Sequence, residues 1–204
     1  MSINNCESHH VVNKYFIFIM NNQMNCVYIG DLPLDTTEVF IEETLLGDYE
    51  GISKIKLFRK TNETYCFVSF FSEEMAKKVI MEMNYTKIYG KPIRILPTDN
   101  ETMEIIRSKL GNIIIWGFDE DIEPSQLHEA FSTYGEVISC KIPMSVKNGK
   151  WVSDGYGYVQ FCELQNALKC IKELKCASIN DKPIFLCESI NQSRGFKAFL
   201  RTKK

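Results

Sequence analysis

Apolar residues alternate along several short runs of this chain, and between those runs they recur every three or four residues. The run Tyr65–Phe70 places Tyr65 and Phe67 on one face of a strand, while the apolar residues between and after them point to the other face. The run Tyr156–Phe161 repeats this pattern. A strand with large apolar groups on both faces has two explanations. Either the aromatic rings on the open face stack nucleotide bases, or that face packs against a second sheet.

The repeat extends beyond these two strands. Val27–Leu32 opens the first copy and Ile113–Phe118 opens the second, while Gly90–Ile93 and Asp181–Ile184 close them. The same order and spacing in both halves indicate two copies of one fold, and 204 residues are enough for two domains of about 80 to 90 residues each.

The segments between the strands have helical periodicity. Asp35, followed three residues later by Glu38, predicts a capped first helix, and Pro124 marks the start of its counterpart. The apolar stripes predicted for these helices are Ile41 with Leu45 and Leu127 with Phe131. Second helices are predicted over Glu73–Met83 and Leu164–Leu174, with Ala76, Ile80, Met83, Ala167, Ile171 and Leu174 facing inward.

Each copy therefore reads β-α-β-β-α-β. We predict an α+β fold with two ferredoxin-like domains, each a four-stranded antiparallel sheet backed by two helices. The predicted segments are an N-terminal extension, disordered or docked, at 1–24, the first domain at 25–97, a linker at 98–111, the second domain at 112–189 and a basic tail at 190–204.

The aromatic strands resemble the octamer of the RNA-recognition motif (RRM), Lys/Arg-Gly-Phe/Tyr-Gly/Ala-Phe-Val-x-Phe/Tyr. The second copy, Asp154–Phe161, departs at the first position and has Tyr for Phe at the fifth. The first copy, Glu63–Phe70, keeps the aromatics but lacks the leading base and the glycines. The resemblance covers about residues 25–97 and 112–189 and implies the RRM fold with single-stranded RNA as the ligand.

The resemblance also implies which residues stack bases. In the first domain they are Tyr28, Tyr65 and Phe67. In the second they are Tyr156 and Tyr158, with Ile114 where an aromatic is expected and Phe185 on the closing strand as a partial replacement. Because each stacked base contributes about 1–3 kcal/mol, the complete first platform is expected to bind RNA more strongly.

The charge of the chain argues against strong RNA binding. The chain has 24 basic and 26 acidic residues, a net charge of −2, and Glu63 and Asp154 occupy the octamer position that is usually basic. The basic residues expected on the open faces are Lys54, Lys56 and Arg94 in the first domain and Lys141 in the second. Weak, salt-sensitive RNA binding follows, with a platform that binds mainly protein as the alternative.

Two subfamilies share further segments with this chain. Phe70–Glu74 and Asn84–Arg94 resemble subunit 4 of the spliceosomal splicing factor 3b complex. Tyr28–Leu32, Gly111–Ile113 and Ser139–Lys141 resemble the first two motifs of cytoplasmic poly(A)-binding proteins. Chain length favours the splicing subunit, since poly(A)-binding proteins normally continue into further motifs.

The preferred resemblance implies a nuclear ribonucleoprotein subunit in pre-mRNA splicing, docked on a larger protein subunit and contacting RNA near the branch site. The alternatives are a cytoplasmic mRNA-binding factor of the poly(A)-binding type and an RRM scaffold with little RNA affinity.

The segments outside the two repeats support fewer structural predictions than the repeats do. The linker has an acidic first half, and Met103–Ile106 is expected to form a helical turn. The tail from Asn191 is basic and offers Phe196 and Phe199 to anchor on the second domain or on a partner. Tyr15–Met20 is too short for a membrane span, and we expect no membrane association.

The sequence offers no catalytic chemistry. It has no Cys-x-x-Cys pair and only three histidines, two of them adjacent near the start, so we expect no metal site and mostly buried, reduced cysteines. No nucleophile–base set, paired carboxylates or phosphate loop emerges. We therefore expect a protein that is not an enzyme, with no cofactor and no small-molecule substrate.

Overall fold

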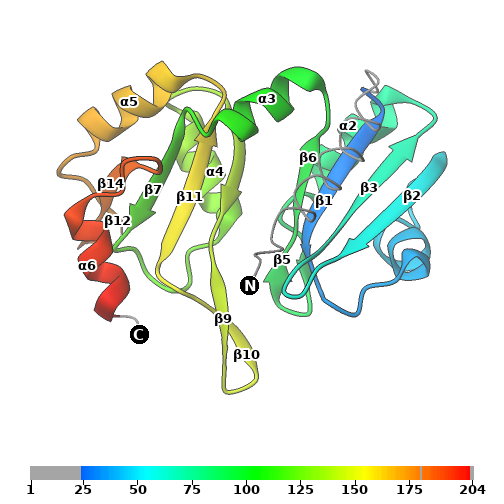
Figure 1. The fold of residues 1–204 in the computed structure, drawn as a ribbon, viewed down its shortest axis with the longest axis horizontal. Coiled ribbons are helices and arrows are strands. Elements are labelled where there is room, and N and C mark those ends of the chain that lie inside the picture. The colour runs from blue at the N-terminus through cyan, green and yellow to red at the C-terminus, as the bar shows by residue number, and fades with distance from the viewer. Residues whose placement is uncertain (1–23, 180, 203–204) are drawn as a thin grey trace, which may run out of the picture.

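The computed structural model describes residues 24–179 and 181–202. Two α+β domains lie side by side and are joined at one end by helix α3 (Figure 1). The expectation for the N-terminal extension falls on residues 1–23, outside the described part of the chain. No helix of the described residues is long and apolar enough to cross a membrane.

The first domain has the predicted β-α-β-β-α-β order, with a small hairpin before its last strand. Its elements are β1 (Cys26–Leu32), η1 (Phe40–Leu45), β2 (Ile52–Arg59), β3 (Thr64–Phe70), α2 (Glu73–Met83), β4 (Lys87–Ile88), β5 (Lys91–Pro92) and β6 (Arg94–Pro97). The antiparallel sheet has the order β2-β3-β1-β6, so the octamer strand β3 and the opening strand β1 lie at its centre.

The second domain repeats this topology and adds a hairpin and a C-terminal helix. Its elements are β7 (Asn112–Trp116), α4 (Pro124–Ser132), β8 (Val137–Lys141), β9 (Met144–Lys147), β10 (Lys150–Ser153), β11 (Tyr156–Phe161), α5 (Leu164–Glu173), β12 (Ser178–Ile179), β13 (Lys182–Pro183), β14 (Phe185–Glu188) and α6 (Arg194–Thr202). The sheet order is β14-β7-β11-β8, again with the octamer strand and the opening strand in the middle.

The first helix departs from the prediction at its N-terminus and in its winding. Thr37, not Asp35, caps it: the Thr37 hydroxyl accepts a hydrogen bond of 3.1 Å from the Phe40 amide. The prediction of Asp35 as the cap was wrong because Thr36 first closes a turn onto the Pro33 carbonyl. The helix is a π-helix, yet it buries the two predicted residues, Ile41 and Leu45.

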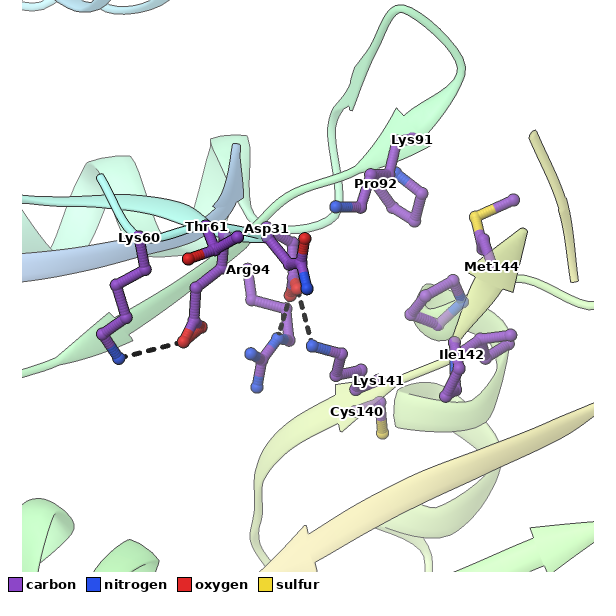
Figure 2. Close-up of a pocket in the computed structure, with 14 residues that line it drawn as sticks. Asp31, Lys60, Thr61, Lys91, Pro92, Arg94, Cys140, Lys141, Ile142 and Met144 are labelled. Carbon is purple, nitrogen blue, oxygen red and sulfur yellow. Dashed lines mark hydrogen bonds and ion pairs between the residues drawn. The ribbon is translucent and has the colours of Figure 1, made fainter. Parts of the chain in front are cut away.

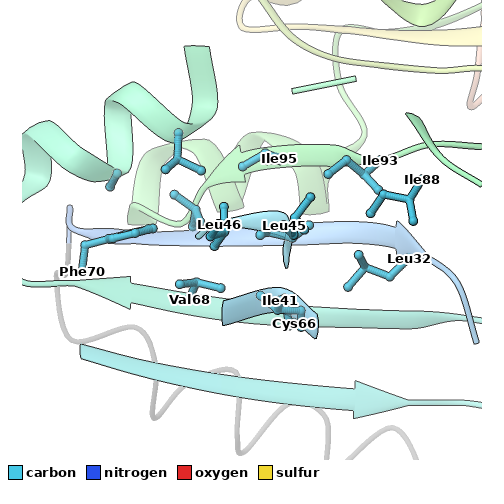
Figure 3. Packing of buried hydrophobic residues seen from close by; sticks show 14 residues of the cluster. Leu32, Ile41, Leu45, Leu46, Cys66, Val68, Phe70, Ile88, Ile93 and Ile95 are labelled. Atoms are coloured by element: carbon cyan, nitrogen blue, oxygen red, sulfur yellow. The ribbon is translucent and has the colours of Figure 1, made fainter. Parts of the chain in front are cut away.

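Strand alternation places the first domain's core on the helix side of its sheet. Ile29, Cys66 and Val68 face the helices. Figure 3 shows Cys66 and Val68 in one cluster with Ile41 of η1 and with Ile93 and Ile95. Residues at alternate positions of β1 and β3 face away from this core.

The second helices pack largely as predicted. Ala76 and Ala167 are buried, and the other four predicted residues are partly buried against the two cores. Val79 and Cys170 are buried as well, one helical position beside the predicted stripe.

The connector is a helix longer than the predicted turn. Helix α3 (Asn100–Ser108) is capped by Asp99, whose carboxylate accepts a 2.8 Å hydrogen bond from the Thr102 amide. Within α3, Met103 is buried. The outer strands β6 and β8 contact each other across the domain boundary, which brings the edges of the two sheets together.

Candidate nucleic-acid interface

The three predicted aromatics of the first sheet form one contiguous cluster. Tyr28 pairs with Phe67 across β1 and β3, and the two ring centroids are 5.6 Å apart. Tyr65 lies 5.7 Å from Tyr28 and 6.1 Å from Phe67. Tyr28 and Tyr65 are half-buried, whereas Phe67 is only 5% exposed. Burial raises the pKa of the Tyr28 hydroxyl.

A fourth ring, which sequence reasoning missed, belongs to this cluster. Phe58 on β2 stacks on Tyr65 with centroids 5.3 Å apart and planes at 11°, and it meets Phe67 edge-on at 5.9 Å. The signal was present in the alternation of β2, where Lys54, Lys56 and Phe58 fall on the same face as the octamer aromatics. We call Tyr28, Phe58, Tyr65 and Phe67 the first aromatic cluster.

The predicted basic residues of the first sheet lie at its two opposite edges. Lys54 and Lys56 are on β2, opposite Ser69 and Phe67 of β3. Arg94 begins β6, the outer strand on the far side of the sheet. The structure therefore does not bring Arg94 together with the two lysines.

Glu63, at the octamer position that is usually basic, neutralises a neighbour. Its carboxylate forms a 2.9 Å ion pair with Lys60. The same Lys60 ammonium lies 5.2 Å from the centroid of the Tyr65 ring, where it makes a cation–π contact. The one ammonium beside Tyr65 is therefore already paired with a carboxylate, so the octamer end of the cluster carries no net charge from this pair.

The second sheet is covered by the chain's own C-terminal helix. Phe196 of α6 is 1% exposed, and its ring centroid lies 5.3 Å from both Tyr156 and Trp116. Phe199 and Leu200 pack against the same cluster. The predicted position Ile114 is fully buried in it. Tyr156 and Tyr158 are 5.8 Å apart and half-buried.

Trp116 supplies the ring that Ile114 lacks, and sequence reasoning missed it. Trp116 follows Ile114 by two residues on β7, so it lies on the same face. The predicted residue Phe185 pairs with Trp116 across β14 and β7 and stacks on it at 5.6 Å and 25°. Phe185 remains 48% exposed at the edge of the covered face.

Helix α6 is amphipathic in a way that explains its position. Phe196, Phe199 and Leu200 follow the spacing of one helical face, and the exposed residues of the other face include Arg194, Lys197 and Arg201. The Ser193 hydroxyl accepts a 3.1 Å hydrogen bond from the Phe196 amide and so caps the helix. Residues 194–202 of the basic tail therefore form an anchored helix, whose three cations lie on its exposed face.

The remaining predicted residue, Lys141, reaches the other domain. Lys141 pairs with Tyr158 in the second sheet, and its ammonium donates a 2.6 Å hydrogen bond to Asp31 of the first domain. The Asp31 carboxylate also accepts from the Arg94 guanidinium (Figure 2). Burial raises the pKa of Asp31, but the Arg94 and Lys141 cations outweigh burial and lower that pKa to about 2.

Two residues of the first domain, Tyr85 and Lys87, make further contacts with the second. The Tyr85 hydroxyl accepts a 2.9 Å hydrogen bond from the Cys140 amide and lies 2.9 Å from His128 Nδ1. Lys87 and Glu123 form a 2.5 Å ion pair. Tyr85 also packs into the core of the second domain. Together these contacts form a defined interface between the domains rather than a loose tether.

The described cysteines are unpaired, and the described residues hold no metal-type cluster. The seven cysteines that the structure describes are free thiols, four of them buried. Among residues 24–179 and 181–202, no three His, Cys, Asp or Glu side chains are grouped so that they could hold a metal ion.

Comparisons with known proteins agree with this geometry. The model of the RNA recognition motif family matches residues 27–94 and 113–184. Polyadenylate-binding protein 2 of Arabidopsis thaliana is 32% identical over 78% of this chain, and the polyadenylate-binding protein, cytoplasmic and nuclear, of Eremothecium gossypii is 29% identical over 81%. The chain covers only 25% and 28% of the lengths of these relatives.

Solved structures share the fold. A ternary complex of rna15, hrp1 and anchor RNA in 3′ processing has a TM-score of 0.60 at 23% identity, over 80% of this chain and 95% of that one. The RNA-binding domain of Hrp1 in complex with RNA has a TM-score of 0.56 at 22% identity, over 84% and 99%. The chain belongs to the RNA recognition motif family and carries two copies of the motif in tandem.

Proposed function

We propose that this protein binds single-stranded RNA by stacking unpaired bases on the first aromatic cluster, as a non-catalytic component of a ribonucleoprotein. The observation that carries the proposal is the contiguity of Tyr28, Tyr65 and Phe67 on one sheet face, with Phe58 beside them. Base–aromatic stacking contributes about 1–3 kcal/mol per base and accepts any base. Lys54 and Lys56 on β2 supply positive charge for the phosphates.

We further propose mRNA with adenine-rich tracts as the target. The two relatives named above carry polyadenylate binding in their names, and they match across both motifs. On this proposal the protein works on mature mRNA, and a cytoplasmic location follows.

The second candidate is a splicing role like that of splicing factor 3b subunit 4, in the nucleus and with a larger protein partner. It is supported by the segments Phe70–Glu74 and Asn84–Arg94 and by apolar side chains left outside the aromatic faces. Phe71 is 80% exposed and Met81 on α2 is 84% exposed, as a surface that docks on protein requires.

The test is fluorescence anisotropy with labelled single-stranded RNAs of equal length, made of adenine, of uracil and of a branch-site-like mixed sequence. We expect binding to all three, tightest to adenine, and a loss of about fivefold or more in Tyr65→Ala, since one stacked base is lost. The matched control is Tyr89→Ala, because Tyr89 is 74% exposed and lies in the turn between β4 and β5.

The outcomes separate the candidates. Equal loss in the two variants would reject the first aromatic cluster as the binding surface. A preference for the branch-site-like RNA over adenine would favour the splicing role.

A further inference from the structure

An exposed apolar patch lies on the helix side of the first domain. Tyr89, in the turn between β4 and β5, is 74% exposed, and its ring stacks on Phe40 of η1 with centroids 6.3 Å apart and planes at 27°. Phe40 is half-buried and packs against the first core, which lies opposite the first aromatic cluster. Val39, directly before η1, is 60% exposed. We call Val39, Phe40 and Tyr89 the helix-side patch.

The turn that carries Tyr89 favours other residues. Tyr89 and Gly90 have φ angles of 50° and 85°, so both residues of this two-residue turn are left-handed. Such turns prefer Asn, Asp and Gly. A large L-residue is disfavoured there because its Cβ crowds a carbonyl oxygen of its own backbone. The first domain therefore holds an aromatic ring outward at a cost to its own stability.

The second domain shows that the fold does not require these apolar residues. In the sequence, its matching turn has Asn180 and Asp181 where the first has Tyr89 and a glycine. When the buried stripes of η1 and α4 are aligned, Ser125 and Gln126 take the positions of the two patch residues at the start of η1. Both are exposed. The same surface is thus polar in one copy and apolar in the other.

The surface around the helix-side patch is acidic. Between residues 32 and 53 the chain has six acidic residues and no Lys or Arg. Glu38, Glu42 and Glu43 are exposed in or just before η1. They take part in none of the ion pairs formed within residues 24–179 and 181–202. The apolar patch therefore lies beside negative charge that a partner's cations can meet.

The lysines of the hairpin that carries Tyr89 contact the second domain instead. Lys87 forms a 2.5 Å ion pair with Glu123. The Lys91 ammonium lies 5.2 Å from the centroid of the Trp151 ring on β10. Neither lysine pairs with the carboxylates of η1.

We infer that the helix-side patch docks a segment of a partner protein in which aromatic or large aliphatic side chains are flanked by Lys or Arg. The apolar side chains cover Val39 and Tyr89 and remove their exposed area from water. The flanking cations complement the carboxylates of η1. RNA does not fit this surface, because the same carboxylates repel phosphates. Docking here leaves the first aromatic cluster free, so the protein holds RNA and the partner on opposite sides of one sheet.

The test selects binders from a phage-displayed library of random peptides of about 15 residues, long enough for four turns of helix. The bait is the whole chain, and the counter-bait is the double variant Val39→Ser with Tyr89→Asn. This variant carries the residues of the second domain at both positions, and Asn suits the left-handed turn, so its melting temperature should not fall. Anisotropy titrations of the selected peptides then measure affinity for each variant.

We expect selected peptides to be rich in Lys or Arg and in large apolar residues. They should bind the double variant about tenfold or more weakly, since the exposed anchor residues are lost. Glu42→Gln with Glu43→Gln should also weaken binding and reduce its salt dependence. Met81→Ser is the matched control, because Met81 is 84% exposed on the neighbouring helix α2, and should bind like wild type. RNA affinity should be equal in all these proteins, with or without peptide.

Several results would overturn the inference while leaving RNA binding in place. One is that no peptide is enriched on the wild type over the double variant. A second is that the enriched peptides lack Lys and Arg or ignore the loss of Glu42 and Glu43. A third is an equal loss in Met81→Ser, which would place the docking surface on α2. Weaker RNA binding by the folded double variant would overturn it too, since the patch would then belong to the RNA site.

Discussion

The two sheets share one topology and one set of motif positions, yet within residues 24–179 and 181–202 a helix covers only the second of them. In the first sheet, Tyr28 and Tyr65 stay half-buried within a cluster of four rings. In the second sheet, Ile114 is fully buried beneath α6 and Phe196 packs onto Tyr156. A family match identifies both sheets as RRM sheets, but the side chains that cover a sheet decide whether bases can reach it.

The difference has a physical cause at one position. An aromatic ring at Ile114 would stand against α6, whereas the smaller isoleucine lets Phe196 settle between Trp116 and Tyr156. The second sheet buries apolar area against a helix of its own chain, and this burial competes with base stacking on the same face.

The largest expected effect comes from removing aromatic pairs from each sheet in turn. Tyr28→Ala with Tyr65→Ala should weaken RNA binding by roughly 2 kcal/mol or more, at least about thirtyfold in Kd, because two stacking positions are lost. Tyr156→Ala with Tyr158→Ala should change the Kd less than about twofold. Anisotropy titrations measure both, and a larger loss from the second pair would contradict the ranking of the two sheets.

The next effect concerns the helix that covers the second sheet. Phe196→Ala should destabilise the docking of α6 by about 3 kcal/mol, since a buried phenylalanine is truncated. The expected readouts are faster proteolysis after residue 190, a change in Trp116 fluorescence and tighter RNA binding. Lys197→Ala, on the exposed face of the same helix, is the control and should leave all three unchanged. Unchanged proteolysis in Phe196→Ala would show that other contacts hold the helix.

A smaller effect is expected at the domain interface. Tyr85→Phe removes the hydroxyl that accepts from the Cys140 amide, and the unsatisfied amide should cost about 1–2 kcal/mol of coupling between the domains. NMR relaxation measures this coupling as the difference between the tumbling times of the two domains. Identical tumbling times in wild type and variant would show that the remaining interface contacts are enough to keep the two domains coupled.

The smallest effect is a pH dependence of the same interface. Burial lowers the pKa of His128 below its usual 6.5, so the neutral imidazole is the form that accepts from Tyr85 at Nδ1. The contribution of this hydrogen bond to the coupling between the domains is therefore complete above about pH 6.5. It is lost as the pH falls below that value. Asp31 adds no dependence in this range, because its pKa of about 2 keeps it charged.

The relaxation measurement that tests Tyr85→Phe, repeated between about pH 7.5 and pH 5, checks this sign. Domain coupling should fall in the wild type and stay flat in Tyr85→Phe. Coupling that strengthens on acidification would contradict the assignment of the proton to Tyr85.

Most of the fold could be predicted because it follows local patterns. Alternation along Tyr65–Phe70 and the helical period of Glu73–Met83 depend only on nearby residues, and both elements were predicted within a residue of their bounds. The cap at Thr37 was missed because Asp35 and Thr37 are both good capping residues, and the preceding turn at Thr36 decides between them.

The parts of the candidate site that could not be predicted depend on contacts distant in sequence. Docking of α6 on the second sheet and the contact of Lys141 with Asp31 require the positions of whole elements, which no local pattern provides. The sequence did single out Phe196 and Phe199 as anchors on the second domain or on a partner, and the structure places both on the second domain, but the helix that carries them was not predicted.

The helical connector has a consequence for how long a ligand stays bound. At about 1.5 Å per residue, the nine residues of α3 span about 13 Å, whereas an extended chain of that length would reach about 30 Å. Together with the contacts of Tyr85 and Asp31, this shortness keeps the second domain close to any strand held by the first. The released end of such a strand would meet its site again at an effective concentration on the order of millimolar. Modest contacts on each domain would then add up to a long residence time.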